Sequence, residues 1–502
     1  MACGTELEAD AQPIAIALAG GPDNGLAASI AQFGDGPDLP PGSRRTRTII
    51  VALLVFGFAF LAYYLAPTIV ISVANLKYKW TEPIHWLDFY VYLADAMNHG
   101  TLNLDGTGAP LDHPDLVIQP DGDVYLPYQP APAVLLMPFV AIWGTGIDQW
   151  LFSMIVGAAN VALFWYILRL MGMSRTTKLL LIPFFAFGTA NFYSATTGTL
   201  WFYNHVVSVM FLELAIIFMS RRSTPILTAL SLGGAFMSRQ PTILAAPFFI
   251  YWMAAQRHPD RFGLADAMGA LTLLVRLQFS SAWETVRDGL GPIVRDKRVI
   301  GQIALFCAVL VPFGVLSLWY NAARFGGIFD TGLDEIYAKY GNCCYSIYQS
   351  FETTRFKEFD LRNLPLHLYT IFLLPPTFQP PIGAQMFQNS TGIRPSEFGM
   401  SAILTSPPFI FAFLAMRKDA LKTASWLVIP LVALPTLMYY SQGWVQFGYR
   451  YLMDYLPFLM ILTAFGFEAY TSRRSFWIKL SLVALAVVVG FWGRYWGTRL
   501  GW

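Results

Sequence analysis

Residues 85–104, HWLDFYVYLADAMNHGTLNL, carry the side chains best placed for acid–base chemistry. If the part that begins at Asp88 is helical, Asp88, Tyr92 and Asp95 fall at positions i, i+4 and i+7 and share one face. The stretch follows a long apolar segment, and acids held against a membrane surface are costly unless they serve a purpose. Two interpretations stay open: a functional carboxylate at Asp88, or an amphipathic surface helix whose acids face water.

A second group of polar residues interrupts apolar sequence further along the chain. Asn204 and His205 lie in GTLWFYNHVV, and Arg239 lies in SRQP, next to a proline. A single histidine is either a hydrogen-bonded structural residue or an acid–base group. An arginine at a break in a helix either anchors the helix at the membrane surface or binds an anion. The sequence leaves both pairs of roles open.

Two arginines lie beside aromatic residues where apolar segments end or begin. Arg324 is part of LWYNAARFGG, and Arg450 is part of GYRYLMDYLPF. Aromatic belts with anchoring arginines are common in membrane proteins. The alternative is a phosphate clamp, because a guanidinium group binds two phosphate oxygens at once and an ammonium group does not. For Arg450 the clamp is favoured, because Tyr449, Tyr451 and Asp454 are close enough in sequence to orient it.

The composition predicts an all-α polytopic membrane protein. Apolar residues make up 55% of the chain and charged residues 13%, against about 25% charged residues in soluble domains. The net charge is +2 and the basic residues lie in short clusters between apolar runs, which excludes nucleic acid as an obvious partner. No glycine-rich nucleotide motif occurs at a meaningful place. The four cysteines lack metal-ligand spacing, and the need for a divalent metal stays open.

The apolar runs predict about eleven transmembrane helices. Whether PAPAVLLMPFVAIWG (130–144) crosses the membrane decides the topology, because a crossing would place the later basic clusters outside. A helix lying in the membrane surface keeps those clusters and the N-terminus in the cytoplasm, and this interpretation is adopted. The predicted spans are 49–71, 149–170, 179–193, 203–219, 225–237, 243–255, 299–320, 400–415, 426–440, 455–470 and 476–492.

Long connecting segments lie mainly on the predicted outer side, which indicates that the functional face is outside. The first of them holds nine acids against two lysines. The predicted divisions are a disordered cytoplasmic tail (1–48), a transmembrane domain (49–493) with external loops 72–148 and 321–399 and a cytoplasmic loop 256–298, and a short C-terminal tail (494–502).

Several runs of sequence follow one another in a specific order. An acid opens DFYVYLADAMNHGTLNLD, and YLPYQPAPAVLLMPFVAIWG follows in the same loop. SRQPTILAAPFF, LWYNAARFGGIFDTG, FGMSAILTSPPFI and QFGYRYLMDYLPF come later. Residues 49–491 thereby resemble the GT-C membrane glycosyltransferases, particularly bacterial relatives of protein O-mannosyltransferases and aminoarabinose transferase.

This resemblance implies a GT-C-like fold and transfer of a sugar from a polyprenyl-phosphate donor, with inversion, at the outer face of the bacterial plasma (inner) membrane. Asp88 matches the first-loop acid that serves as general base toward an acceptor hydroxyl. In the family the second external loop often carries another acid, and this chain has Asn204 and His205 there. The family's first-loop acid is often followed directly by a glutamate, and this chain has Phe89 after Asp88. The implied catalytic residues are Asp88 and His205, and the implied substrate-binding residues are Tyr92, Asp95, Asn204, Arg239, Arg324, Arg450 and Tyr451.

The implied partners are the lipid bilayer, the lipid-linked sugar donor, and a glycan, lipid or protein acceptor. Arg450 is expected to meet the charge on the leaving phosphate, with Arg324 or Arg239 in reserve. Two other classes stay open. A transporter or lipid flippase would carry ionisable residues inside its spans, for which Glu213 and Glu468 are candidates. A non-catalytic envelope-assembly protein would tolerate the loss of Asp88.

Overall fold

The computed structural model describes residues 41–73, 87–220, 224–258, 295–340, 358–378, 392–415 and 420–500, with a few positions between 276 and 288. Most of these residues are helical, and the described strands are two residues long. His85 and Trp86, most of the predicted tail and cytoplasmic loop, and residues 341–357 and 379–391 of the second external loop lie outside the described residues.

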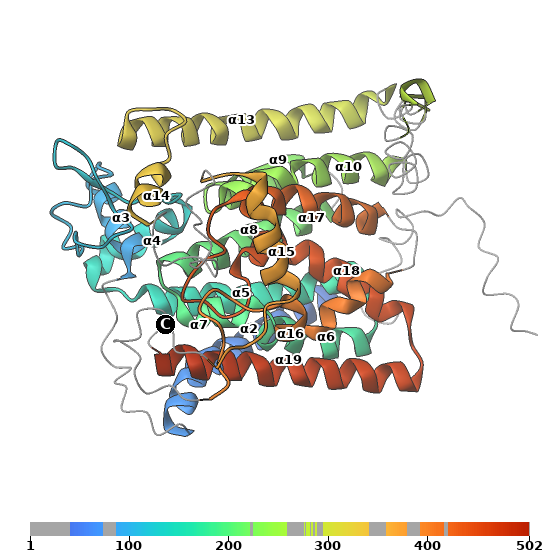
Figure 1. Ribbon diagram of the computed structural model, residues 1–502. Coiled ribbons are helices and arrows are strands. Elements are labelled where there is room, and N and C mark those ends of the chain that lie inside the picture. The colour runs from blue at the N-terminus through green and yellow to red at the C-terminus, as the bar shows by residue number, and fades with distance from the viewer. Residues whose placement is uncertain are drawn as a thin grey trace, which may run out of the picture.

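Long apolar helices lie side by side in a bundle (Figure 1). Within the described residues, seven helices are long and apolar enough to cross a membrane. At one edge of the bundle α13 packs on α9 and α10, and at the other α19 packs on α2 and α6. The seven are α2 (Pro41–Val73), α5 (Gln149–Leu170), α8 (Leu200–Ser220), α13 (Lys297–Phe325), α17 (Ala420–Met438), η9 (Arg450–Tyr455) with α18 (Leu456–Ala469), and α19 (Arg473–Leu500).

Shorter helical pieces fill the remaining predicted spans. The two helices α6 and α7 meet at an angle of 42°, so the described count is eight if this bent pair is one span. Prolines explain several of the interruptions, because proline removes a backbone donor and disturbs the preceding turn. The predicted number of eleven therefore stays a prediction. The pieces are α6 (Arg175–Phe187), α7 (Ala190–Thr197), α9 (Pro225–Phe236), η4 (Gln240–Ala245), α10 (Ala246–Arg257), α16 (Ala402–Thr405) and η8 (Pro407–Leu414).

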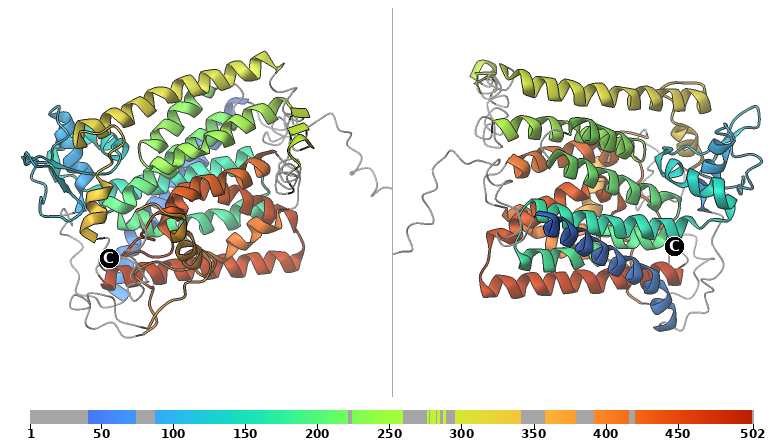
Figure 2. Two further views of the ribbon diagram at one scale, coloured as in Figure 1. Left: turned by 45° about the horizontal axis from the view of Figure 1, so that its top comes forward. Right: turned by 180° about the vertical axis from the view of Figure 1, so that it is seen from behind.

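Two short helices gather at one end of the bundle, with a small antiparallel hairpin between them in sequence (Figure 2). Both α4 and the turn η3 that follows it contact α3, so the chain begins and ends α4 at this same end. This is the arrangement expected if residues 130–144 do not cross the bundle. The elements are α3 (Phe89–Asn98), β1 (Val117–Ile118), β2 (Val124–Tyr125), α4 (Ala131–Trp143) and η3 (Gly144–Gly146).

Basic residues stand at several helix ends away from α3 and α4: Arg169 in the last turn of α5, Arg175 at the start of α6, Arg257 at the end of α10, Lys297 at the start of α13 and Arg473 at the start of α19. A side-chain contact between Arg169 and Thr48 joins the end of α5 to α2. The Arg257 guanidinium, at the end of α10, lies 2.9 Å from the Asp296 carboxylate, which caps α13. By the positive-inside rule, this charge distribution is the one expected of a cytoplasmic face.

The second long connecting segment folds back onto the bundle through α14 (Leu333–Tyr340), η6 (Leu361–Asn363) and α15 (Leu364–Phe372). On α15, His367 Nδ1 lies 2.8 Å from the Tyr449 hydroxyl and Nε2 lies 2.7 Å from the Tyr439 carbonyl oxygen. Burial lowers the pKa of His367 to about 4, so the ring is neutral at physiological pH. A neutral ring donates to the carbonyl and accepts from the hydroxyl, and so fixes the chain that leads into η9.

Both predicted tails are shorter than expected. Helix α2 begins at Pro41, before the boundary at residue 48, and α19 continues to Leu500, so residues 494–500 are helical. Within this last stretch Arg494 and Trp496 are buried. The sequence missed both extensions because the apolar run ends several residues inside each helix.

Candidate functional site

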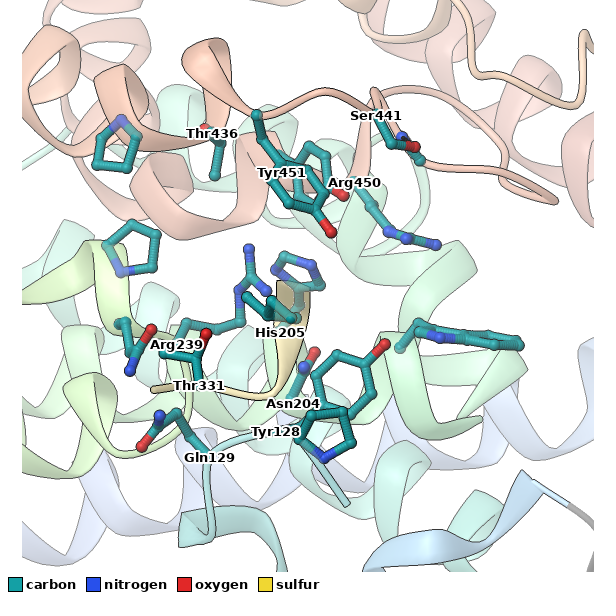
Figure 3. Close-up of a pocket in the computed structure, with 18 of the residues that line it drawn as sticks. Tyr128, Gln129, Asn204, His205, Arg239, Thr331, Thr436, Ser441, Arg450 and Tyr451 are labelled. Carbon is teal, nitrogen blue, oxygen red and sulfur yellow. Dashed lines mark hydrogen bonds between the residues drawn. The ribbon is translucent and has the colours of Figure 1, made fainter. Parts of the chain in front are cut away.

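A cavity of about 680 Å³ lies near the end of the bundle that carries α3 and α4 (Figure 3). Its walls come from six parts of the chain: the segment between α3 and α4, the first turns of α8, the junction of α9 and η4, α14, the end of α17, and η9 with the chain that leads into it. Much of the lining is apolar, including Phe236, Ile243, Leu244, Leu333, Ile336, Pro435 and Val445.

A buried charge pair fixes one side of the cavity. Arg239, at the break between α9 and η4, donates from Nε and Nη2 to the two carboxylate oxygens of Asp454, over 3.0 and 2.9 Å. Asp454 is fully buried and the Arg239 side chain is 16% exposed. In a bidentate ion pair of this kind, two hydrogen bonds and the charge attraction offset the free energy lost when both groups leave water. The charge of Arg239 is therefore already balanced within the protein.

The same carboxylate orients His205. Its Nδ1 lies 2.9 Å from Asp454 Oδ1, and His205 lines the cavity. Because a carboxylate paired with arginine can only accept a hydrogen bond, Nδ1 carries the proton and Nε2 of the neutral ring is an acceptor. The structure thus joins His205 and Arg239, both singled out in the sequence, through Asp454.

Arg450 differs from Arg239 in its surroundings. Its Nη1 makes one long contact of 3.4 Å to the Trp444 carbonyl oxygen, and its buried Nε has no hydrogen-bond partner among the described residues. In the described part of the chain, no carboxylate is recorded within the ion-pair distance of 4.0 Å of this guanidinium. It lies 5.6 Å from the ring centre of Phe202 and 5.4 Å from that of Tyr451. Arg450 is consequently a cation that lines the cavity with donors to spare.

Asp115 is the carboxylate that the small hairpin brings to the cavity. The pairing of β1 with β2 places Asp115, two residues before β1, near Tyr128, three residues after β2. Asp115 Oδ2 accepts from the Tyr128 hydroxyl over 3.1 Å and from Trp201 Nε1 over 2.5 Å. Both donors use the same oxygen. The carboxylate is thus held in place while all three residues line the cavity.

Arg324 has a structural position outside the cavity lining. Its Nε donates to the Tyr320 carbonyl oxygen over 3.0 Å, its Nη2 donates to Asn321 over 3.2 Å, and its Nη1 contacts the Leu126 carbonyl oxygen. Its donors hold the backbone just before Tyr128. The expectation that Arg324 is a reserve phosphate ligand is not supported by this arrangement.

Asp88 directly precedes α3 as its N-cap residue and lies next to Asp148 and Gln149 at the start of α5. It is 6% exposed and is not among the residues that line the cavity. Burial raises its pKa to about 8, the carboxylate of Asp148 adds to the shift, and the backbone N–H of Gln149 opposes it. Asp88 is therefore protonated at neutral pH. Tyr92 and Asp95 lie within α3 while Asp88 precedes it with a non-helical backbone, and none of the three lines the cavity.

Of the nine sequence-predicted site residues, the structure brings five to one cavity: Asn204, His205, Arg239, Arg450 and Tyr451. Asp454 was expected to orient Arg450, and this was wrong, because its carboxylate is bound by Arg239 and His205. Sequence reasoning also missed Asp115, which was one of nine acids in its loop. Its only local signal is the hairpin pattern that follows it.

Within the described residues, no group of three histidine, cysteine, aspartate or glutamate side chains could hold a metal ion. Comparison of the chain with protein-family models, curated proteins and solved structures gives no match.

Proposed function

We propose that this protein is a membrane glycosyltransferase that takes a sugar from a polyprenyl-phosphate donor and gives it to an envelope acceptor. The observation that carries the proposal is the pair of groups in one cavity: Arg450, a cation with no carboxylate partner recorded in the described chain, and Asp115, a fixed carboxylate. A guanidinium with open donors suits a phosphate group. An apolar lining suits the carbon chain next to that phosphate.

The reaction follows from these positions. Asp115 takes the proton of an acceptor hydroxyl, the acceptor oxygen bonds to the anomeric carbon, and the bond from that carbon to the phosphate oxygen breaks with inversion. The lipid phosphate leaves as an anion, whose growing charge Arg450 stabilises. Asp115 takes the general-base role first expected of Asp88, because Asp88 is buried beside Gln149 and away from the cavity.

The membrane orientation is part of the proposal. The basic end of the bundle faces the cytoplasm, and the cavity opens toward the outer face of a bacterial plasma membrane, where lipid-linked sugars are donors. The predicted external loop 72–148, which contains Asp115, has nine acids and two lysines, and this low content of basic residues supports the orientation. A need for a divalent metal is a separate question that added chelator would answer.

Donor turnover by purified protein tests the proposal. The protein is incubated in turn with radiolabelled polyprenyl-phosphate mannose, glucose and arabinose, and release of lipid phosphate is measured. We expect one donor to be consumed by the wild type and not by Arg450→Gln. The matched control is Arg362→Gln, since the Arg362 side chain is 60% exposed and pairs with Asp360. Equal turnover in both variants would remove Arg450 from the reaction.

A transporter or flippase is the second candidate, and Glu213 is the observation that favours it. Glu213 lies within α8 and is fully buried, and in the described part of the chain neither of its carboxyl oxygens has a hydrogen-bond partner. Replacement by leucine separates the two functions. A transferase is expected to keep its turnover in Glu213→Leu, because the residue lies outside the cavity lining. A transporter is expected to lose lipid movement in reconstituted vesicles, because ionisable groups inside spans mark transport pathways.

A further inference from the structure

Two amide side chains in the cavity carry buried oxygen atoms, Gln129 Oε1 and Asn204 Oδ1. Within the part of the chain that the structure describes, neither oxygen has a recorded hydrogen bond, although the Asn204 side chain lies beside that of Tyr90. Gln129 is 7% exposed and Asn204 is 2% exposed, and both line the cavity. Buried polar atoms are nearly always hydrogen-bonded, so orphaned acceptors in a cavity indicate a ligand or solvent that donates to them.

These acceptors lie close to the fixed carboxylate. Gln129 follows Tyr128, whose hydroxyl donates to Asp115. Asn204 comes three residues after Trp201 on α8, and the Trp201 indole also donates to Asp115. Figure 3 shows Asn204 beside Tyr128, and Gln129 farther to the left, below Thr331. Gln129 Oε1 and Asn204 Oδ1 are thus hydrogen-bond acceptors near Asp115, and the Arg450 guanidinium provides donors in another part of the cavity.

Aromatic side chains border the same wall. The ring centre of Trp201 lies 5.9 Å from that of His113, which in turn lies 5.0 Å from that of Phe89. The bond from Trp201 Nε1 to Asp115 fixes the orientation of the indole. A rigid aromatic ring offers an apolar surface next to polar groups, which matches a ring-shaped ligand that has hydroxyls at its edge and C–H groups on its face.

We propose that Asp115, Gln129, Asn204 and Trp201 form a subsite for the acceptor, and that the acceptor is a neutral sugar ring of a glycan. The inference rests on the proposed function, and it selects one class among glycan, lipid and protein acceptors. Several hydroxyl donors on one ring satisfy several acceptors at once. A ring held next to Asp115 presents a hydroxyl to the base, and an acidic sugar is repelled by that carboxylate.

Binding of simple glycosides tests the subsite without any turnover. The probes are the methyl glycosides of mannose, glucose and arabinose, with methyl glucuronide as the acidic comparison. Saturation-transfer NMR is measured on protein in a detergent or nanodisc free of sugar groups. We expect saturable binding of at least one neutral glycoside, no binding of the glucuronide, and at least tenfold weaker binding in the double variant Gln129→Leu/Asn204→Leu.

Two controls keep the test decisive. The melting temperature of the double variant in detergent shows whether it is folded, so that lost binding in a folded protein is due to the two removed amides. Asp112→Asn removes an exposed acid of the same loop that does not line the cavity, and is expected to have no effect. Equal binding by wild type and double variant, or no binding by wild type, overturns the subsite. Binding of the lipid-phosphate donor through Arg450 is measured in parallel, so its survival or loss judges the proposed function separately.

Discussion

The carboxylate of Asp454 lies 2.9 Å from Nδ1 of His205, across 249 residues of sequence, and it also binds the guanidinium of Arg239. All three side chains are largely removed from water. This contact ties η9 to α8 and to the junction of α9 with η4, which are three of the walls of the cavity. The shape of the cavity thus depends on one buried acid.

Asp454→Asn is predicted to destabilise the protein strongly. Loss of one partner leaves Arg239 buried with an unbalanced charge, which typically costs about 3–5 kcal/mol. Replacement of both partners, in Arg239→Met/Asp454→Leu, should restore much of the thermal stability. Unfolding temperature in detergent measures both effects. If Asp454→Asn melted like the wild type, the pair would not hold the cavity together.

Arg450→Lys is predicted to weaken donor binding about tenfold and to lower turnover as well. Lysine keeps the charge but loses the paired donors that match phosphate oxygens. A belt arginine would behave differently, because lysine reaches the membrane surface equally well. Equilibrium binding of polyprenyl phosphate distinguishes these roles, with Arg362→Lys as the exposed control. Unchanged binding in Arg450→Lys would indicate that Arg450 anchors the helix at the membrane surface and does not bind phosphate.

Asp88→Asn is predicted to stabilise the protein, and more so as pH rises. Burial raises the pKa of Asp88 from its ordinary value of 3.8 to about 8. Between these values the folded state holds a proton that the unfolded state has lost, so wild-type stability falls as pH increases. Asparagine lacks this titration. Melting temperatures of both proteins from pH 5 to pH 8 should diverge with increasing pH, and parallel curves would contradict the buried, protonated state.

Labelling of single cysteines is predicted to place residues near Gly122 outside and those near Thr176 and Arg473 inside. Gly122 lies in the turn between β1 and β2, at the α3–α4 end of the bundle, and the other two begin helices at the opposite end. The four native cysteines are replaced first. An impermeant thiol reagent added to whole cells should modify only the first site. Modification of Thr176→Cys from outside would reverse the proposed orientation.

Much of the helical core could be predicted from sequence, because runs of apolar residues long enough to span a bilayer carry a strong signal. The junction of α6 with α7 and the short pieces around η4 and η8 were harder. Each contains or follows a proline. The polar run SRQP marks the break before η4, whereas the apolar runs around the α6–α7 junction and η8 give no sign of where the helix breaks.

The candidate site was only partly visible in the sequence for a different reason. Arg450 and His205 stand out as single polar residues in apolar surroundings. Asp115 does not, because acids are common in its loop, and only the hairpin and the indole of Trp201 bring it to the cavity. Helical spacing in turn placed Asp88 on a face with Tyr92, but spacing within one helix says nothing about which neighbour that face meets.

The most direct test of the account compares donor turnover in Asp115→Asn and Asp88→Asn. Each change removes proton acceptance and keeps the size of the side chain. We predict that Asp115→Asn lowers turnover by about 10² or more, with donor binding intact, because a general base contributes on that scale. Asp88→Asn should keep turnover close to wild type. The opposite result, with full activity in folded Asp115→Asn and loss in Asp88→Asn, would contradict the assignment of the cavity as the active site.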